Sequence, residues 1–216
     1  MLDAVIIDFD DTIVQTSRFR KGLLEKTLRE WSGAKVDANI ALDWGEPFRR
    51  MVGSLIGINE LEGFIKYYLC AMARNPVKPC IGAEKFLRTL QQQQIPVVIL
   101  SSSISELIQF DLETLKFSNT VEKIFDSEMV DASKPNPIAL RTPLEWLKKT
   151  YSVQSSNCIY IGDSLADMEC AGDQIDFYAV LSGSNTRQDF LNCGMVADRV
   201  VADLEELNLI FTSTAD

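Results

Sequence analysis

The sequence of 216 residues contains no histidine, and this absence excludes several classes of catalytic site. Ser-His-Asp and Cys-His catalysis both need an imidazole, and so does a mixed cysteine–histidine zinc site. The five cysteines are odd in number and form no Cys-x-x-Cys pair, so we expect reduced, mostly buried thiols. Acid–base chemistry must therefore depend on carboxylates, lysine, tyrosine or a metal-bound water.

Long hydrophobic runs are also missing. No run approaches the roughly 18 uninterrupted apolar residues that a membrane span needs. The first residues include Asp3 and show neither a basic leader nor a small-residue cleavage site, so we expect a cytoplasmic protein. The net charge of −10 disfavours nucleic acid as the main partner. The sequence does not indicate an oligomeric state.

Short apolar runs alternate with helical patterns along most of the chain. The expected strands cover 4–9, 95–100, 123–126, 158–161 and 177–181. The expected helices cover 82–94, 105–115, 137–151 and 165–172. Strands that alternate with helices predict βαβ units and a parallel sheet, hence an α/β fold with a Rossmann-like three-layer core. In such sheets ligands bind at the carboxyl ends of the strands.

Residues 15–78 break this alternation, because they show helical patterns and no convincing strand. We predict an all-helical cap at 15–78, inserted into a core domain formed by 1–14 and 79–216. The cap holds 11 basic and 7 acidic residues, whereas the remainder holds 10 and 24. A basic cap over an acidic core is consistent with an anionic substrate held between them, although chance would also explain the asymmetry.

Four polar motifs follow the predicted strands or precede the helices. They are Asp8-Phe9-Asp10-Asp11-Thr12, Ser101-Ser102-Ser103, Lys134-Pro135-Asn136-Pro137 and Gly162-Asp163-Ser164-Leu165-Ala166-Asp167. Paired carboxylates at a strand end repel each other, and a divalent cation is the obvious compensating charge. A strand-end serine beside a helix N-terminus suits a phosphate oxygen. Each motif alone is weak, because such residues often cap helices or form turns, but their order is specific.

With these four motifs the whole chain resembles the haloacid dehalogenase superfamily of phosphohydrolases. Asp8 to Thr12 is similar to its first motif, Ser101 to the second, Lys134 to the third, and Gly162 to Asp167 to the fourth. The insertion resembles the helical cap of the phosphoglycolate phosphatase and β-phosphoglucomutase branch. The resemblance implies Mg²⁺-dependent hydrolysis of a small phosphorylated metabolite such as phosphoglycolate.

The resemblance also implies roles for individual residues. Asp8 would be the nucleophile that forms an aspartyl-phosphate, and Asp10 the general acid and base. Mg²⁺ would be held by Asp8, the backbone carbonyl of Asp10 and Asp163, with Asp167 orienting these ligands or Lys134. Phosphate would be bound by Ser101, Ser102 and Lys134. In the cap, Arg49 or Arg50 would reach the distal end of the substrate, or would simply lie on a solvated helix face.

Two positions depart from the usual family pattern. Asp11 stands where the first motif usually has glycine, which brings a third carboxylate near the site. Gln15-Thr16 stands where the hinge often has Asp-Ser or Asp-Thr. The first change is compatible with catalysis, and the second puts the hinge contacts of the cap in question.

Three alternatives to a phosphatase stay open at this point: two other enzyme activities and a non-catalytic function. A phosphomutase of the same branch generally uses a cap histidine, which this chain lacks. A phosphonate hydrolase needs a Schiff-base lysine, for which Lys21, Lys26, Lys35 and Lys66 are available but match no motif. The chain would also fit a non-catalytic binding module on the same fold. A dehalogenase would not need Asp10, because a halide leaves without a proton.

Overall fold

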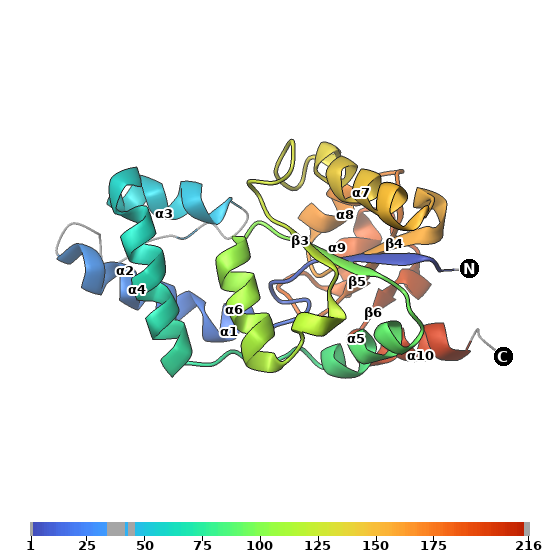
Figure 1. Cartoon of the computed structure of the whole chain (residues 1–216). Coiled ribbons are helices and arrows are strands. Elements are labelled where there is room, and N and C mark those ends of the chain that lie inside the picture. The colour runs from blue at the N-terminus through green and yellow to red at the C-terminus, as the bar shows by residue number, and fades with distance from the viewer. Residues whose placement is uncertain (1, 34–41, 43–45, 214–216) are drawn as a thin grey trace.

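The core is a six-stranded parallel sheet, and the computed structural model describes residues 2–33, 42 and 46–213 of the chain. The strands are β1 (Ala4–Ile7), β2 (Val97–Leu100), β3 (Lys123–Phe125), β4 (Cys158–Gly162), β5 (Asp176–Val180) and β6 (Val200–Val201). Their spatial order is β3-β2-β1-β4-β5-β6, and every neighbouring pair is parallel (Figure 1). The order reverses between β1 and β4, the point at which doubly wound sheets bind ligands. The predicted Rossmann-like α/β core is thereby confirmed.

The central strands are buried on both faces of the sheet, which is why they appear in the sequence as continuous apolar runs. In β1, Val5 and Ile7 pack into one hydrophobic cluster, whereas Ala4 and Ile6 pack into another on the opposite face. All four of these side chains are fully buried. Because successive side chains of a strand point to opposite faces, one short strand contributes to two separate cores.

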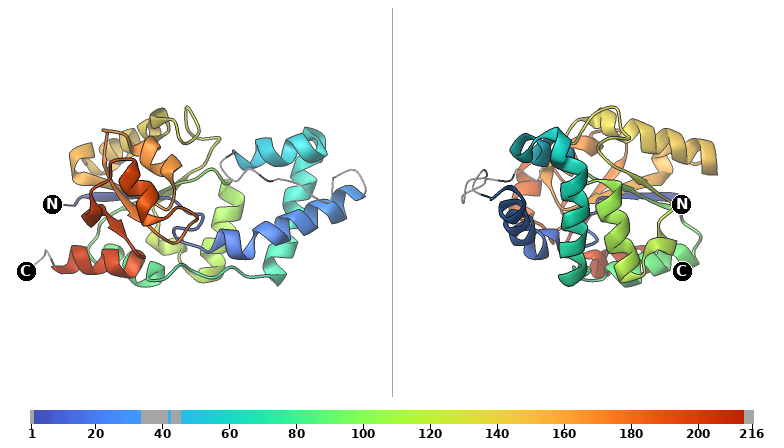
Figure 2. Two further views of the ribbon diagram at one scale, coloured as in Figure 1. Left: turned by 180° about the vertical axis from the view of Figure 1, so that it is seen from behind. Right: turned by 60° about the vertical axis from the view of Figure 1, so that its left-hand side comes forward.

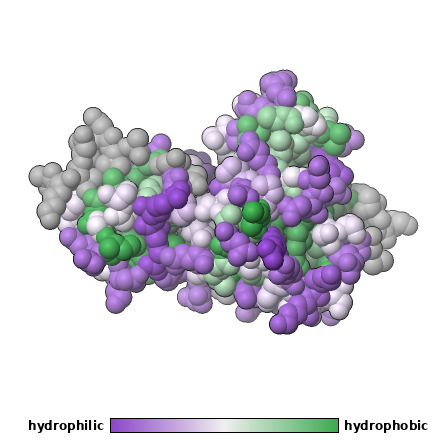
Figure 3. Space-filling model, turned by 90° about the horizontal axis from the view of Figure 1, so that it is seen from above, coloured by the Kyte–Doolittle hydropathy of each residue, from purple (hydrophilic) through white to green (hydrophobic). Residues whose placement is uncertain are grey.

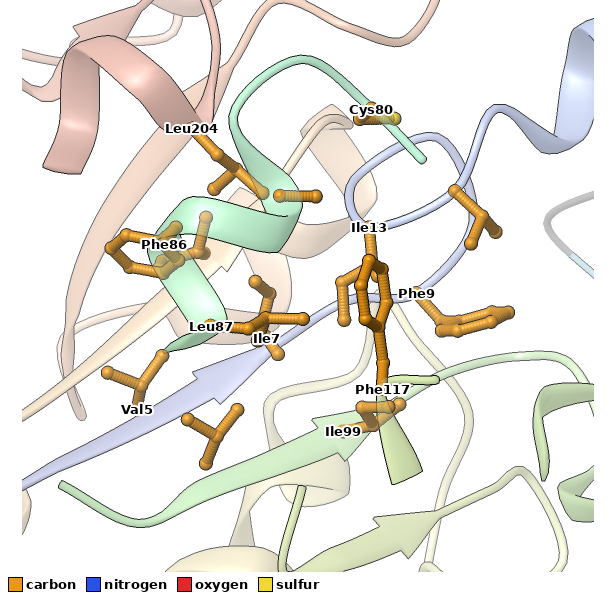
Figure 4. Close-up of a cluster of buried hydrophobic side chains, with 14 of the residues drawn as sticks. Val5, Ile7, Phe9, Ile13, Cys80, Phe86, Leu87, Ile99, Phe117 and Leu204 are labelled. Atoms are coloured by element: carbon orange, nitrogen blue, oxygen red, sulfur yellow. The ribbon is translucent and has the colours of Figure 1, made fainter. Parts of the chain in front are cut away.

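Three helices cover the first face of the sheet. They are α5 (Ala83–Gln92), α6 (Ser105–Leu115) and α10 (Leu204–Ser213). The close-up in Figure 4 shows Phe86 and Leu87 of α5, with Leu204, around Val5 and Ile7 of the central strand. Burial of large apolar side chains of this kind stabilises the fold by about 1.5–3 kcal/mol for each.

The second face is covered by a 3₁₀ turn and three more helices. These are Pro137–Leu140, α7 (Arg141–Tyr151), α8 (Leu165–Ala171) and α9 (Arg187–Asn192). Their buried side chains, such as Leu147 and Phe190, pack on Tyr160 and Phe177 of the sheet. Helices on both faces complete the three-layer arrangement expected from the alternation of strand and helix.

Residues 15–78, the cap, contain helices and no strand in the part that is described. The helices are α1 (Thr16–Phe19), α2 (Lys21–Ser32), α3 (Phe48–Ile56) and α4 (Leu61–Arg74), with a 3₁₀ turn at Ile58–Glu60. They lie beyond the carboxyl ends of the strands (Figures 1 and 2). Their shared hydrophobic cluster also contains Ile104 and Leu107, at the start of α6. The boundaries at 15 and 78 stay a prediction, and the cap packs directly on the core.

The two connections between cap and core run beside each other. Val14 forms an antiparallel bridge with Pro79, and the Cys80 amide donates to the carbonyl of Ile13 at 2.8 Å. Gln15 adds two contacts, from its amide to the Lys78 carbonyl at 2.9 Å and from Nε2 to the Pro79 carbonyl at 2.8 Å. The hinge glutamine that departs from the family pattern therefore joins the two connections.

The structure differs from the expected secondary structure at several elements. The expected helix 137–151 is a 3₁₀ turn followed by α7, and the strand β6 and the helices α9 and α10 were not predicted. No helix in the described part of the chain is both long and apolar enough to span a membrane. The face in Figure 3 is mostly hydrophilic, with small hydrophobic patches between the polar side chains.

Gly82 provides a test of how α5 is seated against α10. Its φ is +77°, and an added Cβ would lie 2.1 Å from the backbone nitrogen of Glu205. We expect Gly82→Ala to lower the free energy of unfolding by about 2 kcal/mol or more, and the melting temperature by roughly 4–8 °C. Gly22→Ala is the matched control, because an added Cβ within the exposed part of α2 meets nothing within 4 Å. The melting temperature of Gly22→Ala should rise by about 1–4 °C. An equal fall in the melting temperatures of the two variants would contradict this account.

Candidate active site

The carboxyl ends of three neighbouring strands bring the polar motifs together. Asp8 and Asp10 follow β1, Ser101 follows β2 and Asp163 follows β4. Since β2, β1 and β4 are adjacent and parallel, their carboxyl ends lie at one edge of the sheet. Asp8, Ser101 and Asp163 are all buried at this edge. The structure therefore brings these predicted site residues to one edge of the sheet.

Lys134 lies between two aspartates from different segments. Its Nζ donates to Asp8 Oδ1 at 2.6 Å and to Asp167 Oδ1 at 2.7 Å, and all three side chains are almost fully buried. Burial lowers the pKa of Lys134, but the charges of Asp167 and Asp8 outweigh this and raise that pKa above its ordinary value. The two carboxylates therefore favour the charged form of Lys134 inside the site.

Hydrogen bonds to both of its oxygens fix the carboxylate of Asp167 in place. Tyr160 donates its hydroxyl to Asp167 Oδ1 at 2.6 Å, and Ser164 donates its amide and hydroxyl to Oδ2 at 3.2 and 2.5 Å. Ser164 and Asp167 form a capping box at the start of α8. A Cβ on Gly162 would come within 2.5 Å of Asp167 Cγ, so only glycine leaves room for this carboxylate.

Asp10 accepts hydrogen bonds from two hydroxyl groups. Thr16 Oγ1 donates to Oδ1 at 2.6 Å, and Ser101 Oγ donates to Oδ2 at 3.2 Å. Burial raises the pKa of Asp10 even though the bond from Thr16 lowers it. A carboxyl group with a raised pKa retains a proton more readily, which suits a general acid.

Burial also raises the pKa values of the other two carboxylates near the strand ends. The pKa of Asp8 lies well above its ordinary value, chiefly because of burial, although Lys134 opposes the shift. The pKa of Asp163 rises to about 7 through burial and the nearby charges of Asp167 and Asp11. Thr12 Oγ1 donates to Asp163 Oδ1 at 3.1 Å. The site therefore holds more carboxylate than its one lysine balances.

The donor set fits a hard divalent cation. Ligand oxygens of Asp8, Asp163 and Asp167 lie within 4.8 Å of one another, and all three residues are buried. Lys134 pairs with Asp8 and Asp167, which leaves Asp163 without a cation among the described residues. Carboxylate oxygens are the ligands that Mg²⁺ prefers. Because Asp167 already accepts bonds from Lys134, Tyr160 and Ser164, Asp8 and Asp163 are the more available ligands.

The predicted phosphate-binding serines lie in the loop between β2 and α6. Ser101 is buried and accepts a bond from the Ser103 amide at 3.0 Å. The carbonyl of Ser102 accepts a bond from the Phe48 amide at 3.1 Å, at the start of α3. This loop therefore contacts both Asp10 and the cap.

The two cap arginines have different surroundings. Arg49 forms ion pairs with Glu62 in α4, with Glu106 in α6 at 2.6 Å and with Glu128 at 3.2 Å. Arg50 is exposed and pairs with Glu46 on its own segment. Arg49 therefore links the cap to the core, and the substrate role of either arginine stays a prediction.

The sequence analysis assigned no role to several residues of the site. Thr12, Thr16 and Tyr160 each donate a hydroxyl to a site aspartate, and Arg20 and Asp111 form a buried ion pair. A Cβ on Gly183 would overlap Asp163, because it would lie 1.7 Å from Oδ2. Thr12 is the last residue of the first motif and Thr16 follows shortly after it, and that position was the available signal. The Arg20–Asp111 pair spans 91 residues and left no local signal.

Comparison with known proteins identifies a family for this chain. The family model for haloacid dehalogenase-like hydrolases matches residues 5–180. The chain belongs to this family. No curated protein matches it.

Solved structures of family members share the fold across the whole chain. A protein assigned as a haloacid dehalogenase-like hydrolase from Bacteroides fragilis is 24% identical, with a TM-score of 0.72 over 96% of this chain and 100% of that one. A protein assigned as a phosphoglycolate phosphatase from Haemophilus somnus is 13% identical, with a TM-score of 0.70 over 99% and 98%. A β-phosphoglucomutase from Clostridium difficile is 18% identical, with a TM-score of 0.72 over 99% and 96%. At these identities the likeness establishes the fold alone.

The raised pKa of Asp163 leads to a prediction about stability. Between the ordinary pKa of about 4 and the folded value of about 7, the folded state binds more protons than the unfolded chain, so stability falls as pH rises. We expect the metal-free protein to melt at a lower temperature at about pH 8 than at about pH 5.

Saturating Mg²⁺ should raise the melting temperature more at the higher pH, because metal ligands must be deprotonated. Thermal denaturation with chelator and with Mg²⁺ measures both effects, and an undiminished Mg²⁺ shift in Asp163→Asn would contradict the assignment.

Proposed function

We propose that this chain is a Mg²⁺-dependent phosphatase that hydrolyses a small phosphomonoester through an aspartyl-phosphate on Asp8. The family membership supports hydrolase chemistry. The observation that carries the proposal is the buried contact of Lys134 with Asp8 and Asp167, beside Asp10 with its raised pKa. Phosphoglycolate is the candidate substrate that the family resemblance names, and two solved structures of similar fold are assigned to that activity.

In the proposed reaction Asp8 attacks phosphorus in line and the ester oxygen leaves. Lys134 holds the Asp8 carboxylate at 2.6 Å and offers a positive charge to the transferring phosphoryl group. Ser101 and Ser102 lie in the loop beside Asp10 and would bind the same group. Water then attacks the aspartyl-phosphate, which releases phosphate and restores Asp8.

Asp10 would move the proton in both steps. It gives its proton to the leaving oxygen as the P–O bond breaks, and it then accepts a proton from the attacking water. Thr16 and Ser101 orient its carboxyl group through their hydroxyls. Asp8 and Asp163, with the Asp10 carbonyl, would hold Mg²⁺, which supplies positive charge for the phosphoryl oxygens when bound. Asp167 would position Lys134.

The competing activities have less support in the described residues. Lys21, Lys26 and Lys66 are exposed, and Lys35 lies outside the described residues, so none of the three described lysines is buried as a Schiff-base site requires. The likeness to the β-phosphoglucomutase shows a common fold and, at 18% identity, gives no support for mutase activity. A panel of small phosphomonoesters, with p-nitrophenyl phosphate, tests phosphatase activity directly. Phosphate release that depends on Mg²⁺ and stops with chelator supports the proposal, and no release from any member rejects it.

Substitution of the nucleophile gives the first specific test. We expect Asp8→Asn to lower kcat by about 10³-fold or more, because the amide cannot form the phosphoenzyme. Acid-quenched mass spectrometry should detect phosphate on Asp8 in the unsubstituted enzyme and not in the variant. Asp173→Asn, at an exposed position beyond the end of α8, serves as the control and should retain normal rates. Normal turnover by Asp8→Asn would contradict the nucleophile assignment.

The proton donor can be tested through the leaving group. An alkyl alcohol needs a proton as it leaves, whereas p-nitrophenolate leaves readily without one. We expect Asp10→Asn to reduce kcat for an alkyl phosphate by about 10²–10⁴-fold. The reduction for p-nitrophenyl phosphate should be clearly smaller. Equal losses on the two substrates would indicate that Asp10 has another role.

A further inference from the structure

The first turn of α3 in the cap lies against the serine loop of the core, Ser101–Ser103. The Phe48 amide donates to the carbonyl of Ser102 at 3.1 Å. Within the loop the Ser103 amide donates to Ser101 Oγ at 3.0 Å, and Ser101 Oγ donates to Asp10 Oδ2 at 3.2 Å. The cap is therefore connected, through one short loop, to the hydroxyl that orients the proposed proton donor.

Arg49, the next residue of α3, extends across the boundary between cap and core. Its Nη2 lies 2.6 Å from Oε1 of Glu106, in the first turn of α6 directly after the serine loop. Its Nε lies 3.2 Å from Oε2 of Glu128, which follows β3, and this ion pair is not aligned as a hydrogen bond. Nη1 pairs with Glu62 of α4 inside the cap. Each nitrogen of the guanidinium thus lies beside a carboxylate.

The two core partners of Arg49 belong to one unit, because the buried side chain of Asp126 joins their segments. Asp126 Oδ2 accepts bonds from the amide and the hydroxyl of Ser105, which directly precedes Glu106. Asp126 Oδ1 accepts a bond from the amide of Glu128 at 2.9 Å. Arg49 therefore contacts both sides of a unit to which the end of the serine loop is attached.

The charges around Arg49 disfavour a direct contact with the substrate. Three glutamates surround one guanidinium, so an anionic group that approached it would meet an excess of negative charge. The Arg49 side chain is 18% exposed, whereas the glutamate side chains are 45–69% exposed. Solvent makes each exposed pair weak by itself, and pairs that form a network are the ones that contribute measurably.

We propose that Arg49 is a positioning residue that acts through Glu106 and Glu128 to hold the serine loop in place beside Asp10. It does not contact the substrate. The ammonium of Lys134 is held separately by its two aspartates, so the effect is confined to the serine side of the phosphate site. This inference rests on the proposed function, in which the serine loop binds the phosphoryl group.

Inhibition by inorganic phosphate tests this role, with p-nitrophenyl phosphate as substrate and Mg²⁺ present, because phosphate has no distal group for a cap arginine to reach. We expect Arg49→Met to raise the inhibition constant of phosphate about 3- to 10-fold, since a loosened loop must be ordered on binding. kcat/KM should fall by a similar factor for every phosphomonoester. An unchanged inhibition constant, or a loss of kcat/KM confined to substrates with a charged distal group, would overturn the inference.

Substitution of the core partners shows whether Arg49 acts through them. Glu106→Gln with Glu128→Gln should raise the inhibition constant of phosphate as much as Arg49→Met does, and combining all three changes should add nothing further, because each variant breaks the same contacts. If Arg49 bound the substrate instead, the double variant would free the guanidinium, and phosphate affinity would stay constant or improve. Glu62→Gln is the matched control, because it removes only the pair inside the cap, and it should change the constant by less than about twofold.

Thermal denaturation separates positioning from stability. Because the glutamates are largely exposed, we expect the melting temperatures of these variants to fall by less than about 4 °C. A merely structural role would lower the melting temperature and leave the inhibition constant of the folded enzyme unchanged, which would refute the role of Arg49.

The inference and the proposed function fail in different ways. If the unsubstituted protein hydrolyses no phosphomonoester and binds no phosphate, the phosphatase function is rejected, and the role of Arg49 with it. If the unsubstituted enzyme hydrolyses p-nitrophenyl phosphate and phosphate inhibits every variant equally, only the role of Arg49 is rejected.

Discussion

The site depends on one buried ammonium group held between two carboxylates. Lys134 contacts Asp8 and Asp167, and these residues come from two loops and from the first turn of α8. Removing one member of such a group leaves a buried charge unpaired, at a cost of about 3–5 kcal/mol. Tyr160 and Ser164 fix Asp167, so the position of the ammonium is set by the sheet and by α8. The geometry around Asp8 is thereby built before any ligand arrives.

Much of the fold could be predicted from the sequence because the central strands are buried on both faces. Runs such as 4–9 and 158–161 are continuous and apolar for this reason, and polar motifs follow them directly. β6 has only two residues, too few for a pattern. Arg20 was missed because a buried arginine is rare, and its partner Asp111 lies far away in the sequence.

Asp11 shows how a departure from a family pattern can have a local explanation. Its φ of 55° lies in the left-handed region, where glycine is favoured and aspartate is among the better tolerated alternatives. The Asp11 carboxylate accepts a bond from the Ser17 amide at 3.0 Å and another from the Ser17 hydroxyl, at the start of α1. The residue that replaces glycine therefore compensates for its backbone conformation by anchoring the first turn of the cap.

The paired connections at Val14 and Pro79 have a consequence for how the molecule can move. Two chain segments joined by backbone hydrogen bonds resist sliding but tolerate a rotation about their common axis. Such a rotation would separate Arg20 from Asp111, whereas Asp8, Lys134, Asp163 and Asp167 all lie outside residues 15–78 and would keep their mutual distances. The ion pairs of Lys134 therefore do not depend on where the cap helices stand, whereas the hydrogen bond from Thr16 to Asp10 does.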